Sequence, residues 1–333
     1  MSVNIYNIKK NYYTGNYSAN FELADSESLY YKAVSIIDSY INNGSQNNGN
    51  LASEYEQLIV KNEEDQLSVL LSKYVSVIDG NSSDGILDDV DLRTEIMTIE
   101  DSELLNYVLT IYFKILIKTE TSLEDVFKQI SFVYKTLIKD LLSSGIDSLY
   151  PYMEFTFLLG SVAANLKNWD YLQGLIEFLN GKVDIASEDE IMISFLEFIN
   201  ALSSMNTENK DSSFYFVEDL VFNNSSSTNN IFVDLLMINL QLANKNYEEV
   251  EQLINKINAQ ENVSKTGIFY EYFLVANINY RLQINDSNKE IIDSLREELI
   301  SVCQYNGTND TNSYLVEHRA MSEKFDKIVA SYI

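Results

Sequence analysis

The amino-acid sequence predicts an all-α protein, an α-solenoid in which helices follow one another in pairs. The 333 residues include only 11 glycines and one proline, Pro151, so long helices can run with few interruptions. Apolar residues recur at helical spacing along most of the chain. No β-rich segment competes with this pattern.

An apolar stripe at helical spacing runs through residues 247–257, with charged residues on the opposite face. The C-terminal residues repeat the pattern, and their apolar positions are Phe325, Ile328, Val329 and Tyr332. We expect these four side chains to be buried, and we expect a C-terminal capping helix at about residues 314–333.

Clusters of Asn, Ser, Asp and Gly interrupt the helical pattern, as is typical of loops between helices. Residues 42–50 and 79–91 are interpreted as irregular loops of this kind. Because none of these clusters has the character of an interdomain linker, we expect residues 1–333 to form a single domain.

The composition excludes several classes of protein. Hydrophobic residues make up 46% of the chain, which is enough for a large core. The chain has 23 Lys and Arg against 50 Asp and Glu, so its net charge is −27. Phosphate backbones and anionic lipid head groups repel such a chain, and direct binding to nucleic acid or to a membrane is therefore disfavoured.

Cysteine and histidine are too few for most metal or disulfide chemistry. Cys303 and His318 are the only residues of their kinds, so an internal disulfide and a Cys/His zinc site are excluded. A free thiol suits a reducing compartment. With no apolar run long enough for a signal peptide or a membrane span, the sequence predicts a soluble cytoplasmic protein without cofactor or metal.

Four turns share a sequence pattern. Asn168-Trp169 and Asn246-Tyr247 lie 78 residues apart, Asn285-Asp286 follows after 39 more, and Gly15-Asn16-Tyr17 is a fourth member. Helix pairs joined by such turns resemble tetratricopeptide repeats, and Leu159-Gly160 fits the Leu-Gly signature of those repeats. The spacing exceeds the usual ~34 residues and the closing proline is missing, so the predicted array is divergent.

Stacked helix pairs expose a concave face. One amphipathic pair cannot bury its apolar stripe alone, so neighbouring pairs stack and leave a groove lined by the first helix of each pair. The sequence therefore predicts a binding surface for another polypeptide.

The N-terminal segment carries a more specific resemblance. Residues 6–17 read Tyr-Asn-Ile-Lys-Lys-Asn-Tyr-Tyr-Thr-Gly-Asn-Tyr and closely resemble the opening of the fungal epsilon subunit of coatomer. The likeness covers nearly the whole chain and is strongest at its two ends and around the later repeats. The other similar segments are residues 29–33, 209–220, 236–257 and 323–329. Residues 42–50 and 79–91 depart from the family as longer insertions.

The resemblance implies a structural subunit of the COPI vesicle coat, built as a solenoid of tetratricopeptide-like repeats. Such a subunit holds the C-terminal domain of the coatomer alpha subunit, of which a β-hairpin sits in the groove, and it meets other coat subunits indirectly. It acts in Golgi-to-endoplasmic-reticulum retrograde and intra-Golgi transport. The implied location is the cytoplasm and, through the coat alone, the surface of Golgi membranes and COPI-coated vesicles.

The resemblance to tetratricopeptide repeats also implies which residues line the groove, on successive turns of the first helices. They are Lys9, Tyr12, Glu154, Phe157, Ser161, Ala164, Phe232, Leu235, Asn239, Leu242, Glu271, Leu274, Ile278 and Arg281. We expect Phe157 and Phe232 to clamp an apolar strand of the partner. The apolar positions fit a core as well as a contact surface.

Two alternatives remain open. Another cytosolic adaptor of the same fold, such as a chaperone-docking protein, needs basic residues on its first helices, where this chain has Ile5, Phe157, Leu235 and Leu274. An enzyme is the other alternative. Residues 174–183 resemble a phosphate loop with the wrong spacing, and residues 89–100 resemble a calcium loop without its glycine, so we predict that the chain is not an enzyme.

Overall fold

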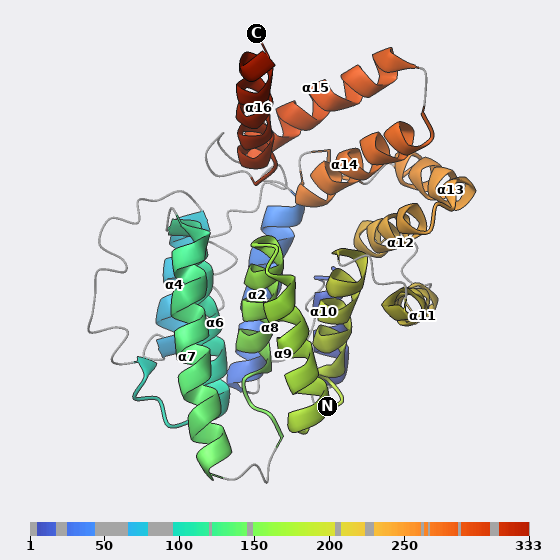
Figure 1. Cartoon of the computed structure of the whole chain (residues 1–333). Coiled ribbons are helices and arrows are strands. Elements are labelled where there is room, and N and C mark those ends of the chain that lie inside the picture. The colour runs from blue at the N-terminus through green and yellow to red at the C-terminus, as the bar shows by residue number, and fades with distance from the viewer. Residues whose placement is uncertain are drawn as a thin grey trace. The chain divides into compact units, whose positions relative to one another are not determined.

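The computed structural model describes residues 5–17, 25–43, 66–78, 96–119, 122–144, 149–203, 208–223, 230–260, 263–265, 267–285, 288–306 and 313–332. Their regular structure is entirely helical, without a strand, which confirms the predicted all-α class (Figure 1). The helices are α1 (Ile5–Tyr13), α2 (Ser26–Asn43), α4 (Gln66–Ile78), α6 (Ser102–Thr119), α7 (Leu123–Ser144), α8 (Met153–Asn165), α9 (Trp169–Lys182), α10 (Glu190–Ser203), α11 (Glu208–Asn223), α12 (Ile231–Ala243), α13 (Tyr247–Asn258), α14 (Ile268–Gln283), α15 (Lys289–Asn306) and α16 (Ser313–Tyr332).

The chain divides into two compact units. The first contains Met1–Ile37 and Gly49–Phe216, and the second contains Asp38–Asn48 and Val217–Ile333. That both belong to one continuous domain stays a prediction. Of the two predicted irregular loops, only Asn42 and Asn43 fall on described residues, where they end α2. None of the described helices is long and apolar enough to cross a bilayer.

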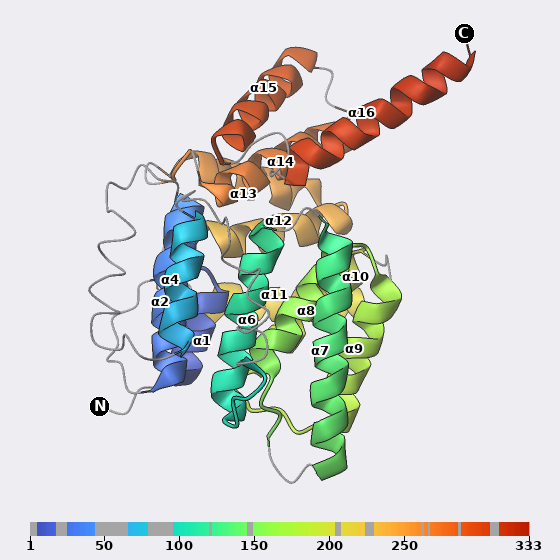
Figure 2. The ribbon, with the colours of Figure 1, turned by 90° about the vertical axis from the view of Figure 1, so that its left-hand side faces the viewer.

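Within each unit, helices contact both their neighbour and the next helix but one (Figures 1 and 2). In the first unit, α8 contacts α9 and also α6 and α10. In the second unit, α12 contacts α13 and also α14. This order of contacts is compatible with an α-solenoid, in which each helix pair stacks on the next.

The four predicted turns share one backbone geometry. In residues 14–16, 166–168 and 244–246, successive N–H groups donate to carbonyls four, three and five residues earlier, which is the Schellman arrangement that ends a helix. The middle residue has positive φ each time: 74° at Gly15, 58° at Lys167 and 60° at Lys245. Asn285 also has a positive φ, of 52°. In its turn, the N–H groups of residues 284 and 285 donate to carbonyls four and three residues earlier. The structure therefore confirms that the turns predicted from the sequence share a conformation.

Gly160 allows two first helices of the first unit to approach each other. A Cβ atom at this position would lie 2.7 Å from Leu196 Cδ2 and 3.4 Å from Leu175 Cδ2. Because Leu196 is fully buried on α10, it has little room to move away. The Leu-Gly signature thus has a packing reason here, which is the close contact of α8 with α10.

The core of the second unit is built by α12 to α15, with Tyr314 and Leu315 of α16 packed against it. Beyond these two residues, the described side chains of α16, at 316 and 318–327, are exposed. Phe325 is 65% exposed, so the expectation that it is buried was wrong. Among the described side chains of α16, those that pack on the core lie in its first turn. Helical periodicity identifies the apolar face of a helix, but it does not show what covers that face. Ile328, Val329 and Tyr332 have side chains outside the described part.

Candidate functional site

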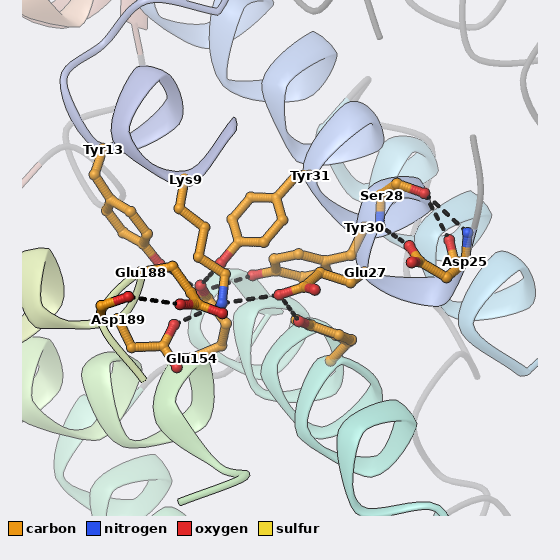
Figure 3. Close-up of polar contacts among 12 residues, drawn as sticks. Lys9, Tyr13, Asp25, Glu27, Ser28, Tyr30, Tyr31, Glu154, Glu188 and Asp189 are labelled. Carbon is orange, nitrogen blue, oxygen red and sulfur yellow. Dashed lines mark hydrogen bonds and ion pairs between the residues drawn. The ribbon is translucent and has the colours of Figure 1, made fainter. Parts of the chain in front are cut away.

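A buried polar network in the first unit joins α1 to α2, α6, α8 and the segment before α10 (Figure 3). We call it the α1 network. Its members are Lys9 and Tyr13 of α1, Glu27, Tyr30 and Tyr31 of α2, Tyr107 of α6, Glu154 of α8 and Asp189.

Lys9 is the single ammonium group of the α1 network. Its Nζ lies 2.8 Å from Glu27 Oε1 and 2.5 Å from Asp189 Oδ1, although Asp189 is 180 residues away in the sequence. The same Nζ lies 5.8 Å from the centre of the Tyr31 ring. With only 5% of the residue exposed, these short charge-assisted contacts replace the water that Lys9 has lost.

Tyrosine hydroxyls satisfy the carboxylates. Tyr13 donates to Glu154 Oε2 over 2.5 Å, Tyr31 donates to Glu154 Oε1, and Tyr30 contributes a longer bond of 3.4 Å to Oε2. Tyr107 donates to Glu27 Oε1 over 2.8 Å. A buried carboxylate is costly unless such donors surround it, so these tyrosines are part of what keeps Glu154 in the core.

Local sequence signals position these groups. Asp25 Oδ1 accepts from the Ser28 N–H, and Ser28 Oγ accepts from the Asp25 N–H, so a reciprocal cap fixes the start of α2 just before Glu27. Asn106 Oδ1 of α6 accepts from the Phe155 N–H over 3.0 Å. This bond caps the first turn of α8 and orients Glu154.

The electrostatics of the α1 network are unbalanced, because one ammonium faces three carboxyl groups. Burial raises the pKa of Asp189 to about 6 against the opposing attraction of Lys9, and repulsion from Glu154 and Glu27 adds to the rise. Burial by itself lowers the pKa of Lys9, but attraction from Asp189 and Glu27 prevails and raises it above its usual value. Lys9 therefore stays charged, and Asp189 is the group that protonation relieves.

This arrangement attaches α1 to the rest of the first unit. The groups of the α1 network pair with one another, and all but Glu27, whose side chain is 18% exposed, are buried. Their chemistry is to hold α1 against α2, α8 and Asp189. In the described part of the chain, no group of three or more His, Cys, Asp or Glu residues is arranged to hold a metal ion.

Four of the predicted groove residues come together around α1. Lys9 and Glu154 belong to the α1 network, and the rings of Tyr12 and Phe157 lie 5.0 and 5.3 Å from that of Tyr13. The predicted groove positions at the start of α8 are thus occupied by the chain's own first helix. Two further predicted residues of α8, Ser161 and Ala164, are half-buried. Partner contact at these positions stays a prediction.

The predicted groove residues of the second unit are divided between core and surface. Leu235, Leu242, Leu274 and Ile278 belong to the hydrophobic core, and Glu271 is buried. The other three remain partly or fully accessible. Half-buried Phe232 packs on Phe269 at 5.5 Å, exposed Asn239 donates to the Leu235 carbonyl, and half-buried Arg281 donates to Asn277 Oδ1.

Sequence reasoning missed several network residues, namely Tyr13, Glu27, Tyr30, Tyr31, Tyr107 and Asp189. The partners of Lys9 lie on other helices, and no fixed spacing connects them. The one available signal was local. In helix 5–13, Lys9 follows Ile8 on the side of the helix that is buried, which is an unusual place for a lysine.

No protein-family model matches the chain, and a search of curated proteins finds no match. The resemblance described above therefore depends on the quoted residues alone.

Proposed function

We propose that the chain is a divergent tetratricopeptide-like solenoid that serves as a scaffold for another polypeptide, as the epsilon-type subunit of the COPI coat. In this role it binds and stabilises the C-terminal domain of the coatomer alpha subunit, and it reaches Golgi membranes and vesicles only through the coat. The main observation that supports this proposal is the turn that recurs at Gly15, Lys167, Lys245 and Asn285.

A recurring turn supports a scaffold because it sets the angle between paired helices. When the same left-handed conformation and similar hydrogen bonds end the first helices of several pairs, pairs that are adjacent stack in a regular way and present the faces of their first helices together. Such a face suits an extended polypeptide segment more than a small substrate.

The N-terminal segment, which is one of those that resemble the coatomer subunit, also has a clear structural role. Residues 6–17 contain α1 and the turn at Gly15, and two of these residues, Lys9 and Tyr13, enter the α1 network. Few other residues would satisfy the buried partners of Lys9 and Tyr13.

The direct test is co-expression of the full chain with the C-terminal domain of the coatomer alpha subunit, followed by size-exclusion chromatography. We expect a complex of one copy of each. Elution as separate species contradicts the proposal. Affinity purification from cytosol checks the assignment independently, since recovery of chaperones in place of coat subunits favours the docking adaptor.

A matched pair of variants tests where the partner binds. Phe232→Glu changes a half-buried predicted groove position, and Phe132→Glu makes the same change at an aromatic residue of α7 that is 73% exposed and outside the predicted groove. We expect the first variant to weaken co-elution at least tenfold, the size of ~1.4 kcal/mol, and the second to have no effect. Far-UV circular dichroism establishes that both variants retain their helices.

A further inference from the structure

A polar cavity of about 380 Å³ lies in the first unit, lined by α9, α10 and Ser212 of α11. This volume is within the range of ~300–1,000 Å³ typical of ligand sites. The side chains that define its chemistry are Gln173, Glu177 and Asn180 of α9 and Glu197 and Asn200 of α10.

The cavity has a buried floor and an open rim. Ile176 and Asn200 are 6% and 4% exposed, whereas Gln173, Glu177 and Asn180 are exposed. Gly181 also lines the cavity, and apart from the adjacent residues and backbone of its own helix no atom lies within 4 Å of the place where its Cβ would be. A side chain entering from solvent therefore finds space at the rim and an amide at the bottom.

Inside the cavity, side-chain amides donate hydrogen bonds to other side chains of the wall. Asn200 Nδ2 donates to Gln173 Oε1 over 2.6 Å, and Gln173 Nε2 donates to Glu177 Oε1 over 2.9 Å. Asn180 Nδ2 donates to Glu197 Oε1 over 2.8 Å. Each glutamate thus accepts one amide bond along the wall, and a carboxylate has room for about three more.

The acceptor sites that remain in the cavity lie on carboxylate oxygens and carry negative charge, and Gln173, Asn180 and Asn200 each keep a second amide N–H. None of the described residues lining it is basic, so Glu177 and Glu197 have no cation within the wall. A cationic ligand with several donors in a planar arrangement satisfies the two carboxylates best. The guanidinium group has five N–H donors, no acceptor and the fork that pairs with carboxylates.

We propose that this cavity binds the guanidinium group of an arginine side chain presented by a partner polypeptide. The inference rests on the proposed scaffold function for the nature of the partner. Free arginine fits less well, because its own carboxylate approaches the two glutamates and is repelled. The net charge of −27 attracts a basic partner to the chain as a whole.

The probe is arginine blocked at both ends, N-acetyl-arginine amide, titrated into the isotopically labelled full-length chain. We expect the side-chain NH₂ resonances of Gln173, Asn180 and Asn200 to shift together and to saturate. N-acetyl-citrulline amide, which has the same shape without the charge, shows the same shifts only at concentrations at least tenfold higher.

Two glutamates of α10 provide the matched variants. Glu197→Gln keeps an oxygen for Asn180 but removes the charge, and it weakens binding of the blocked arginine about tenfold. Glu190→Gln makes the same change at an exposed position outside the cavity and alters binding less than twofold.

Three results overturn the proposal. They are an absence of saturable shifts at the three amides, equal affinity for the citrulline probe, and equal loss of affinity in the two variants. Free arginine binding as tightly as the blocked form overturns the assignment to a polypeptide. Because no coatomer subunit is present in this assay, its failure is distinguishable from failure of the co-expression test.

Discussion

Replacing Lys9 with methionine tests the α1 network most directly. Methionine keeps most of the length and the apolar stem of lysine but removes the ammonium group. Buried Asp189 and half-buried Glu27 are then left without their shared cation. Lys10→Met is the matched control, because it removes the same charge from the next residue, which has no ion pair among the described contacts.

The magnitude follows from the burial of the pair. Removing one partner of a buried ion pair costs about 3–5 kcal/mol, since the remaining charge is left desolvated. The side chains of Lys9 and Asp189 are 6% and 9% exposed, so solvent screens little of this cost. At pH 5, below the Asp189 pKa of about 6, that carboxyl is already mostly protonated in the parent chain. There we expect the cost of Lys9→Met to fall to about half its value at pH 8.

The assay is urea unfolding followed by tryptophan fluorescence. Trp169 is the only tryptophan of the chain and begins α9, so the signal reports on the first unit, which contains the α1 network. A loss below about 1 kcal/mol for Lys9→Met at pH 8, or an equal loss for Lys10→Met, would refute the reasoning. Partial recovery in Lys9→Met/Asp189→Asn supports it, because that variant removes one of the unpaired carboxylates.

Three other predictions concern the first unit and use the same fluorescence assay. The folded-state pKa of Asp189, about 6, exceeds its ordinary 3.8, so this group's stabilisation is complete below pH 3.8 and is lost as the pH rises through 6. Asp189→Asn should remove that dependence, changing the stability difference from the parent by about 2.5 kcal/mol between pH 4 and 8; a constant difference contradicts the shift. Gly160→Ala should destabilise by about 1–2 kcal/mol through its clash with Leu196, whereas Gly174→Ala, in open space on α9, should stabilise by about 0.5–1 kcal/mol; equal effects refute the packing argument. Lys167→Gly should stabilise by about 0.5–1 kcal/mol, because glycine adopts the φ of 58° without steric cost, and a destabilised variant would disprove this.

The agreement between sequence and structure is best at the turns. Gly15, Asn168 and Asn246 mark places where the chain must end one helix and begin another, and the hydrogen bonds involved span at most five residues. Such signals are local, so they can be read from the chain without knowledge of its partners. The sequence did not predict all four positive φ angles, however, because lysine, which stands at 167 and 245, has no preference for the left-handed conformation.

The groove residues show the limit of this approach. Helical periodicity selects the positions that share a face, but it does not distinguish a face that meets another helix from one that meets solvent. Leu274 proved to be core, and Phe325 proved to be exposed, although both lie on apolar stripes. The difference comes from which helices pack on each, and this is a property of the assembled unit.

The amino-acid sequence alone determined that the chain is helical, where four of its turns lie and that its charge is strongly negative, because these follow from composition and from interactions over a few residues. Only the tertiary structure decided that Lys9 meets Glu27 and Asp189, that tyrosines surround Glu154, and that α9 and α10 enclose a cavity rich in acceptors. Those groups are brought together across as many as 180 residues by burial of apolar helix faces, which fixes their distances without leaving a spacing in the sequence.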